Sequence, residues 1–424
     1  MRSVFVNYWH DSNKGDAAIL AGSLALFREV AGKGVTCGLV TKTDARGHLA
    51  RGAVRHTSRD VLIAYPPVAA HPRSRVQWIW QIPRGILKLG FPGLLPSNSG
   101  ECLVERSGVA VLMGGLYLAF PHRTFLRLPF RLFAYVFLLL YARRLGKRVG
   151  LFGCSLGPFN NVWSRALMRW FLKRVDFVVL RESLSADLVG ALGVDSSKIW
   201  VAPDPAFGLP VDRSQDVDAF LARSHLGSQQ FVAFVPRRLR GYGHSLETEK
   251  HLVHGFLALA REVEAKGLKV VVVAHTLGPT RHEDDRLIVR ELVELARAQS
   301  VPVLVFDGDL PPGELAYLYS LARAVVTVRF HGAVMALASG TPTIVIPYFG
   351  TKAQGLFRDL GLERYVVELQ EGWEKSAGEK LGQLIAGEDS TLFKMVPAQA
   401  RERLIAAVRW VLEGTTDARG VVRL

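Results

Sequence analysis

Short apolar runs alternate with segments of helical periodicity along almost the whole chain. The runs are rich in β-branched and aromatic residues and end at glycine, proline or a charge, as buried strands do. The sequence predicts strands at residues 3–7, 35–40, 109–113, 148–152, 177–180, 199–202, 231–235, 269–274, 301–306, 324–328 and 343–346. It predicts helices at 16–30, 130–145, 161–173, 183–192, 247–266, 283–299, 312–321, 333–339, 352–360 and 398–412.

This alternation indicates parallel sheets covered by helices on both faces. It occurs twice, on either side of a polar stretch that contains Pro210 and several Asp and Arg residues. We therefore predict an α/β fold with two Rossmann-like domains that face each other across a cleft. The expected parts are an N-terminal domain (1–210), a hinge (211–230), a C-terminal domain (231–413) and a tail (414–424). In such folds ligands bind at the carboxyl ends of the strands.

Two segments do not fit this scheme. Residues 44–105 are irregular and rich in Pro, Arg and His, and a lid, an acceptor-binding excursion and a mobile loop all agree with that composition. Residues 132–142 form the longest apolar run, which is shorter than the about 20 residues that span a bilayer. This run is either a buried helix or a helix lying on a membrane surface.

Composition narrows the function further. The three cysteines (Cys37, Cys102 and Cys154) are too few and too scattered for a disulfide framework or a metal site, which indicates a reducing compartment. The first apolar run is too short for a signal peptide. The formal net charge of +15 favours an anionic partner, and no nucleic-acid-binding motif is present. We expect a cytoplasmic protein that binds no nucleic acid and no metal.

The most informative stretch is Arg329-Phe330-His331-Gly332, which ends a predicted strand and begins a predicted helix. Arg329 offers a planar fork that matches carboxylate or phosphate, and His331 can move a proton near neutral pH. The helix N-terminus favours an anion, and Gly332 allows close approach of a ligand. In the alternative interpretation Arg329 pairs with a neighbouring helix and His331 caps its own. Position and residue type favour an anion site.

Other polar residues also follow predicted strands. Lys352 begins a helix, where a cation opposes the helix dipole, so either an anionic ligand or simple exposure explains it. Asn13, Gly15 and Asp16 join the first strand to the first helix, although such residues are also ordinary in turns and caps.

Three further candidates are Ser155, Arg181 and Arg237, and His275 lies at a similar position. Ser155 belongs to a glycine-containing segment, 153–159, that matches neither a Walker loop nor a dinucleotide fingerprint.

Taken in order, these motifs resemble the polysaccharide pyruvyl transferase family, whose two-domain fold is like that of the GT-B glycosyltransferases. The matching segments are 13–20, 153–159, 181–183, 203–205 and 329–332, followed by Gly340, Pro342, Tyr348 and Lys352. The sequence departs from the family pattern at residues 113–116, at Cys154-Ser155 and at Glu182, and residues 44–105 match none of it.

The resemblance implies transfer of the three-carbon unit of phosphoenolpyruvate to a sugar of a polysaccharide or lipid-linked precursor, with formation of a ketal and no cofactor. It implies a donor site made of Arg329, His331, Gly332, Arg181, Arg237 and Lys352. His331 would bind the phosphate or protonate the methylene carbon of the donor, and Asp16 would orient or deprotonate the sugar hydroxyl. Asn13, Gly15, Asp16 and Ser155 would lie on the acceptor side.

Two other functions agree with the sequence: a GT-B nucleotide-sugar glycosyltransferase and a non-catalytic phosphoglycan-binding protein. A lipid-linked acceptor would bring the protein into peripheral contact with the inner membrane face, which its positive charge would assist.

Overall fold

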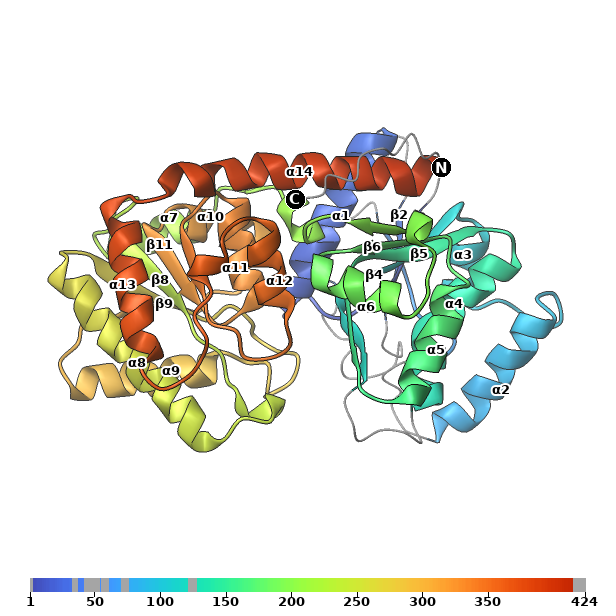
Figure 1. Cartoon of the computed structure of the whole chain (residues 1–424), viewed down its shortest axis with the longest axis horizontal. Coiled ribbons are helices and arrows are strands. Elements are labelled where there is room, and N and C mark those ends of the chain that lie inside the picture. The colour runs from blue at the N-terminus through green and yellow to red at the C-terminus, as the bar shows by residue number, and fades with distance from the viewer. Residues whose placement is uncertain are drawn as a thin grey trace. The chain divides into compact units, whose positions relative to one another are not determined.

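The computed structural model describes residues 3–32, 37–41, 54, 61–69, 76–120 and 128–414. The chain divides into two compact α/β units (Figure 1). Unit 1 consists of residues 1–11, 23–205 and 402–424, and unit 2 of residues 12–22 and 206–401.

Unit 1 contains a parallel sheet with the strand order β3-β2-β1-β4-β5-β6-β7. The strands are β1 (Ser3–Tyr8), β2 (Cys37–Thr41), β3 (Leu62–Ala64), β4 (Val109–Phe120), β5 (Arg148–Phe159), β6 (Phe177–Leu180) and β7 (Ile199–Val201). The helices are α1 (Lys14–Ala31), which begins in unit 2, α2 (Gln77–Gly90), α3 (Ser99–Glu105), α4 (Leu128–Arg144), α5 (Val162–Leu172) and α6 (Ser183–Ala191).

The apolar run at 132–142 is a buried helix, which confirms one of its two interpretations. Nearly all its side chains from Leu132 to Ala142 are buried in α4, in one core with the strands. Among the described residues, no helix combines the length and the apolar character needed to cross a membrane.

The segment 44–105 is more regular than expected. Its described residues include β3, α2 and α3, none of which the sequence predicted. Helix α3 begins with a capping box, in which Asn98 accepts a hydrogen bond from the Glu101 amide and the Glu101 carboxylate accepts one from the Asn98 amide. Pro83 lies inside α2 and interrupts its helical pattern in the sequence.

Unit 2 contains a second parallel sheet with the order β10-β9-β8-β11-β12. The strands are β8 (Phe231–Val235), β9 (Lys269–Val273), β10 (Leu304–Phe306), β11 (Ala324–Thr327) and β12 (Thr343–Val345). The helices are α7 (Gln215–Arg223), α8 (Leu246–Ala265), α9 (Arg286–Ala298), α10 (Pro312–Ser320), α11 (Phe330–Ala338), α12 (Lys352–Asp359), α13 (Trp373–Ala386) and the first part of α14 (Ser390–Glu413).

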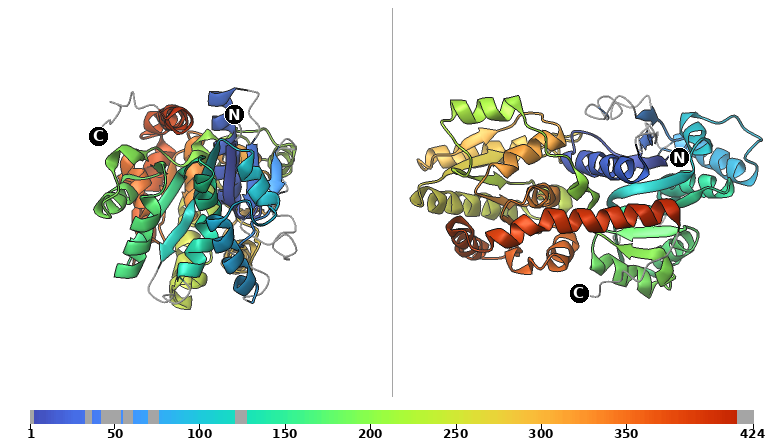
Figure 2. Two further views of the ribbon diagram at one scale, coloured as in Figure 1. Left: turned by 90° about the vertical axis from the view of Figure 1, so that its right-hand side faces the viewer. Right: turned by 90° about the horizontal axis from the view of Figure 1, so that it is seen from above.

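The observed units differ from the expected ranges in three places. The start of α1 belongs to unit 2, as does the segment 211–230 that we expected to be a hinge. In that segment, α7 packs through Phe220 against Phe306, and Asp218 accepts a hydrogen bond from the Tyr317 hydroxyl (2.9 Å). The end of α14 belongs to unit 1, where Trp410 stacks on Trp200 (red helix in Figure 2).

Both sheets have a topological switch point, where successive strands stop adding on one side of the first strand and begin to add on its other side. In unit 2 the chain proceeds from β8 outward to β9 and β10, then returns to place β11 on the other side of β8. Ligands of open α/β sheets bind beyond the strand ends at such a point. In unit 2 these ends lead into Arg237 and Arg329.

Candidate anion-binding site

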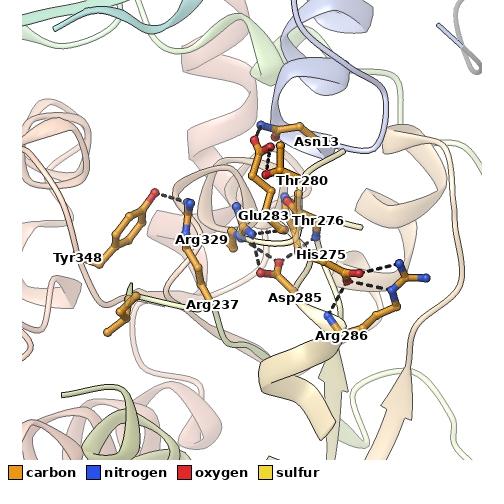
Figure 3. Close-up of polar contacts among 12 residues, drawn as sticks. Asn13, Arg237, His275, Thr276, Thr280, Glu283, Asp285, Arg286, Arg329 and Tyr348 are labelled. Carbon is orange, nitrogen blue, oxygen red and sulfur yellow. Dashed lines mark hydrogen bonds and ion pairs between the residues drawn. The ribbon is translucent and has the colours of Figure 1, made fainter. Parts of the chain in front are cut away.

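Five segments contribute polar residues to the strand ends of unit 2. Arg237 follows β8, His275 follows β9, Arg329 and His331 follow β11, Lys352 follows β12, and the start of α1 belongs to the same unit. Figure 3 shows the side chains of Arg237 and Arg329 near one another, with His275 beyond Arg329. The sequence motifs at residues 13–16 and 329–332 are therefore parts of one unit.

Arg329 is buried and paired with a carboxylate. Its Nε and Nη2 atoms donate to the two carboxylate oxygens of Asp285 (2.8 and 2.5 Å), and Nη2 also donates to the Glu283 carbonyl (2.8 Å). Burial lowers the pKa of the Arg329 guanidinium, but Asp285 outweighs burial and raises it, so the charge persists. This geometry corresponds to the alternative in which Arg329 pairs with a neighbouring helix, because Asp285 directly precedes α9.

Gly332 has a packing reason for being glycine. A Cβ atom at this position would come within 2.6 Å of the Thr327 hydroxyl oxygen. That hydroxyl accepts a hydrogen bond from the Arg329 amide (3.0 Å) and holds the junction between β11 and α11. Close packing of helix against strand therefore accounts for glycine at this position, and the approach of a ligand stays a prediction.

His331 lies in the first turn of α11, against the backbone at the start of α1. A Cβ atom on Gly15 would come within 2.1 Å of His331 Nδ1. Only glycine leaves room for the imidazole there. We expected Gly15 on the acceptor side of the other domain, whereas it belongs to unit 2 and touches the central residue of the donor motif.

The neighbours of Gly15 are also tied to unit 2. Lys14 is buried and ion-paired with Asp309. Asn13 donates a hydrogen bond to Glu283 (3.5 Å), and the buried Asp16 lies in the first turn of α1. Asn13 and Asp16, like Gly15, thus belong to the same unit as Arg237, Arg329, His331 and Lys352.

Arg237 is buried and forms no ion pair with a carboxylate among the described residues. Its guanidinium lies over the rings of Tyr242 and Tyr348, with Cζ 4.0 and 4.3 Å from their centroids, and its Nη1 donates to the Tyr348 hydroxyl. Its Nε and Nη2 atoms are buried and have no hydrogen-bond partner. Two unsatisfied donors on a buried cation are costly unless a ligand accepts their hydrogen bonds.

The positive charge around Arg237 lowers the pKa of the neighbouring Tyr348 hydroxyl. Burial raises the pKa of the Tyr348 hydroxyl, but the nearby Arg237, Lys352 and Arg329 outweigh burial and lower it. The Lys352 ammonium lies 5.3 Å from the Phe330 ring centroid and 5.7 Å from that of Tyr348. Lys352 therefore belongs to the same cationic region.

His275 is a buried, neutral histidine with an unsatisfied nitrogen. Burial, together with the charges of Arg329, His331, Lys14 and Arg237, holds its pKa well below the usual value. Its Nδ1 is hydrogen-bonded to the Tyr319 hydroxyl (2.9 Å), while Nε2 has no partner. The buried hydroxyl of the adjacent Thr276 is also unsatisfied.

Arg181 and Ser155 belong to unit 1 and form a closed buried network. Arg181 donates to Asp204 (2.7 Å) and to the Ser155 hydroxyl (2.6 Å), which donates to Glu182 (2.8 Å). Burial lowers the pKa of Arg181, but Asp204 and Glu182 outweigh it and raise it. The guanidinium predicted to clamp the donor is occupied by these internal partners, and the Ser155 hydroxyl predicted to face the acceptor is occupied as well.

Sequence reasoning missed Asp285 and Thr276 and left His275 and Tyr348 without a role. Asp285 lies within a Glu-Asp-Asp run at a predicted helix start, which has the form of ordinary helix capping. Its pairing with Arg329 joins residues far apart in the sequence, and no local pattern indicates it. Among the residues with described positions, no group of His, Cys, Asp and Glu side chains is arranged to hold a metal ion.

Two α/β units with parallel sheets, one of them with buried cations at its switch point, define a GT-B-like fold with a candidate anion-binding site. The sequence matches the family model described as polysaccharide pyruvyl transferase over residues 13–349, and the chain belongs to that family.

A curated relative and several solved structures are also similar. The amylovoran biosynthesis protein AmsJ of Erwinia amylovora is 24% identical over 268 residues, which cover 61% of this chain and 63%, less than two thirds, of that protein. Among solved structures, UDP-GlcNAc 2-epimerase from Neisseria meningitidis bound to UDP-GlcNAc has a TM-score of 0.56 at 12% identity, over 98% of this chain and all (100%) of that one. Anabaena HepE in complex with UDP has a TM-score of 0.55 at 12% identity, over 98% and 99% of the two chains. At these identities the structures establish the fold.

Proposed function

We propose that the cationic region of unit 2 binds phosphoenolpyruvate and that the chain transfers its three-carbon unit to a sugar as a ketal. The observation that carries this proposal is the buried Arg237 guanidinium, whose Nε and Nη2 donors are unsatisfied. Phosphoenolpyruvate is a small, multiply charged anion, and a planar guanidinium binds its carboxylate or phosphate through two parallel hydrogen bonds.

The neighbouring groups suit the same ligand. The Nε2 of neutral His275 and the hydroxyl of Thr276 are buried and unsatisfied, so each can donate to an anion without adding charge. The N–H groups of Arg329 are hydrogen-bonded to Asp285, so Arg329 attracts the anion through the electrostatic field of its charge. In this proposal Arg237 takes the direct role that the sequence assigned to Arg329.

The reaction needs one proton delivered to carbon and two removed from oxygen. Protonation of the methylene carbon leaves positive charge on the adjacent carbon, where a sugar hydroxyl adds through oxygen and loses its proton. The carbon–oxygen bond to phosphate then breaks, phosphate leaves with the electron pair and takes up one proton, and a second hydroxyl adds to complete the ketal. The products are the ketal and inorganic phosphate.

We assign His331 as the group that donates the proton to the methylene carbon. We assign Asp16 as the group that aligns the sugar hydroxyl. A histidine can donate a proton near neutral pH, and the contact of Gly15 with His331 fixes where its ring lies. Asp16 follows Gly15 directly, so both proposed groups belong to one junction of α1 and α11.

We further propose that the acceptor is a sugar of a polysaccharide or of a lipid-linked precursor, and that the protein works in the cytoplasm at the inner membrane face. The name of AmsJ, an amylovoran biosynthesis protein, supports a role in polysaccharide biosynthesis.

Calorimetric titration with phosphoenolpyruvate, UDP-glucose and UDP-GlcNAc tests the donor. We expect only phosphoenolpyruvate to bind and Arg237→Gln to weaken it by about 1.5–3 kcal/mol, the scale of hydrogen bonds to a charged group. Arg238→Gln is the matched control, because Arg238 is paired with Glu249 and Glu291. Binding of a UDP-sugar alone would indicate a glycosyltransferase, and binding of none would indicate a non-catalytic protein.

A further inference from the structure

Unit 1 exposes large apolar side chains that the transfer reaction does not use. They lie on the outer side of α2 and just beyond it, at Val76, Ile79, Trp80, Ile86, Leu87, Phe91 and Leu94. Trp80 is 76% exposed and Ile79 63%. The inner side of the same helix is docked, because Ile82 is buried and a Cβ on Gly85 would touch Phe133 of α4 (3.0 Å).

The outer side of helix α5 also exposes large apolar side chains, and it exposes positively charged side chains as well. Val162, Trp163 and Trp170 are exposed, whereas Met168 and Phe171 are buried beneath them. Four cations are exposed along this helix and its C-terminal end: Arg165, Arg169, Lys173 and Arg174. Residues 161–174 contain no Asp or Glu.

The two helices belong to one layer of unit 1. Helix α4 contacts both α2 and α5, and Figure 1 shows the three helices beside one another. The Arg174 guanidinium lies over the Trp170 ring (4.4 Å from Cζ to the centroid), which holds a cation beside an exposed aromatic ring. We call the outer sides of α2 and α5 the α2–α5 surface.

We propose that the α2–α5 surface binds the headgroup region of an anionic lipid bilayer. Exposed tryptophans favour the membrane interface, aliphatic side chains insert beneath it, and Lys and Arg bind acidic headgroups. The positive charge of this surface favours an anionic bilayer over a second copy of the chain. In a two-fold contact between copies, the cations of α5 would face one another and repel. This inference is independent of the donor and places membrane contact on α2 and α5 rather than on the buried α4.

Sedimentation with vesicles tests the proposal on the full chain. We expect binding to phosphatidylcholine vesicles containing phosphatidylglycerol at a 7:3 ratio (about a third of the lipid anionic), weak binding to phosphatidylcholine alone, and a loss of affinity with added salt. Arg169→Gln combined with Lys173→Gln should weaken binding about fivefold for each cation removed. Trp163→Gln with Trp170→Gln, and separately Ile79→Gln with Trp80→Gln, should weaken it at least as much.

The matched controls make comparable changes to exposed residues of unit 2. Lys375→Gln with Lys394→Gln removes two exposed cations, and Leu246→Gln with Met395→Gln removes two exposed apolar side chains. Both controls should bind vesicles like the unchanged protein. The proposal fails if the unchanged protein does not bind anionic vesicles, or if the α2 and α5 variants bind as the controls do. It also fails if light scattering finds a dimer that Trp163→Gln with Trp170→Gln converts to a monomer, since a second copy would then occupy the surface.

Discussion

The imidazole of His331 lies so close to Gly15 that a Cβ on Gly15 would come within 2.1 Å of its Nδ1. The two residues are far apart in the sequence and belong to one compact unit. The backbone at the start of α1 therefore helps to fix the ring that we assign as the proton donor.

Gly15→Ala should lower turnover by displacing this ring. A shift of about 1 Å in a catalytic group costs on the order of 10²-fold in rate, and we expect a loss of that size with a smaller change in donor affinity. Steady-state kinetics with donor titration measures both. Gly190→Ala is the control, because a Cβ there meets nothing within 4 Å. Equal activity of the two variants would show that the contact does not position His331.

His331→Gln separates the possible roles of the histidine. If His331 is the general acid, turnover should fall about 10²–10⁴-fold, whereas donor affinity should fall far less because glutamine still donates a hydrogen bond. A phosphate ligand would instead lose affinity and turnover together. A histidine that only caps α11 would lower the melting temperature and leave turnover unchanged, which would remove it from the mechanism.

Much of the fold could be predicted because its strands are continuous and apolar. Strands β6 and β8 have the predicted bounds, β3 was not predicted, and the others differ mainly at their ends. Helix α2 was missed because Pro83 lies inside it and interrupts the helical pattern. The contribution of α1 to both units could not be predicted, because local pattern does not record such contacts.

The sequence predicted the region of the fold in which these basic residues lie, but not the acidic residues with which they pair. The strand-end rule located Arg237, Arg329, His331 and Lys352 in one region. It could not distinguish Arg329, whose guanidinium is paired with Asp285, from Arg237, whose Nε and Nη2 donors lack a partner. That distinction depends on which acid lies opposite each arginine, and tertiary packing decides it.

Asp285→Asn should destabilise unit 2, because it leaves the buried Arg329 without its carboxylate. Removing one partner of a buried ion pair costs about 3–5 kcal/mol, which urea unfolding measures. The neighbouring Asp284 pairs with the half-exposed Arg286, so Asp284→Asn should cost about 1 kcal/mol or less. If the two variants are equally stable, the Arg329–Asp285 pair is not the structural element described here.

Arg181→Met tests whether Arg181 serves the fold or the donor. The change leaves Asp204 buried without its cation, so stability should fall by about 3–5 kcal/mol. Phosphoenolpyruvate affinity of the folded protein should match that of the unchanged protein, in contrast to Arg237→Gln. A folded Arg181→Met protein with weakened donor binding would restore Arg181 to the donor site.

The depressed pKa of His275 predicts how stability depends on pH. The histidine is neutral in the folded protein, whereas in the unfolded chain it takes up a proton below about pH 6.5. The unfolded state therefore binds more protons as the pH falls, and the free energy of unfolding decreases with it. Between pH 6.5 and 5.5 the titration of this single group should lower the free energy of unfolding by about 1 kcal/mol.

The His275→Gln variant cannot titrate at this position. Its free energy of unfolding should therefore fall by about 1 kcal/mol less than that of the unchanged protein over the same interval. Urea unfolding of both proteins at the two pH values measures the difference, and other titrating groups cancel because they are common to both. Parallel pH dependence would mean that His275 is protonated in the folded state, and its Nε2 would then reach the donor as a charged group rather than a neutral one.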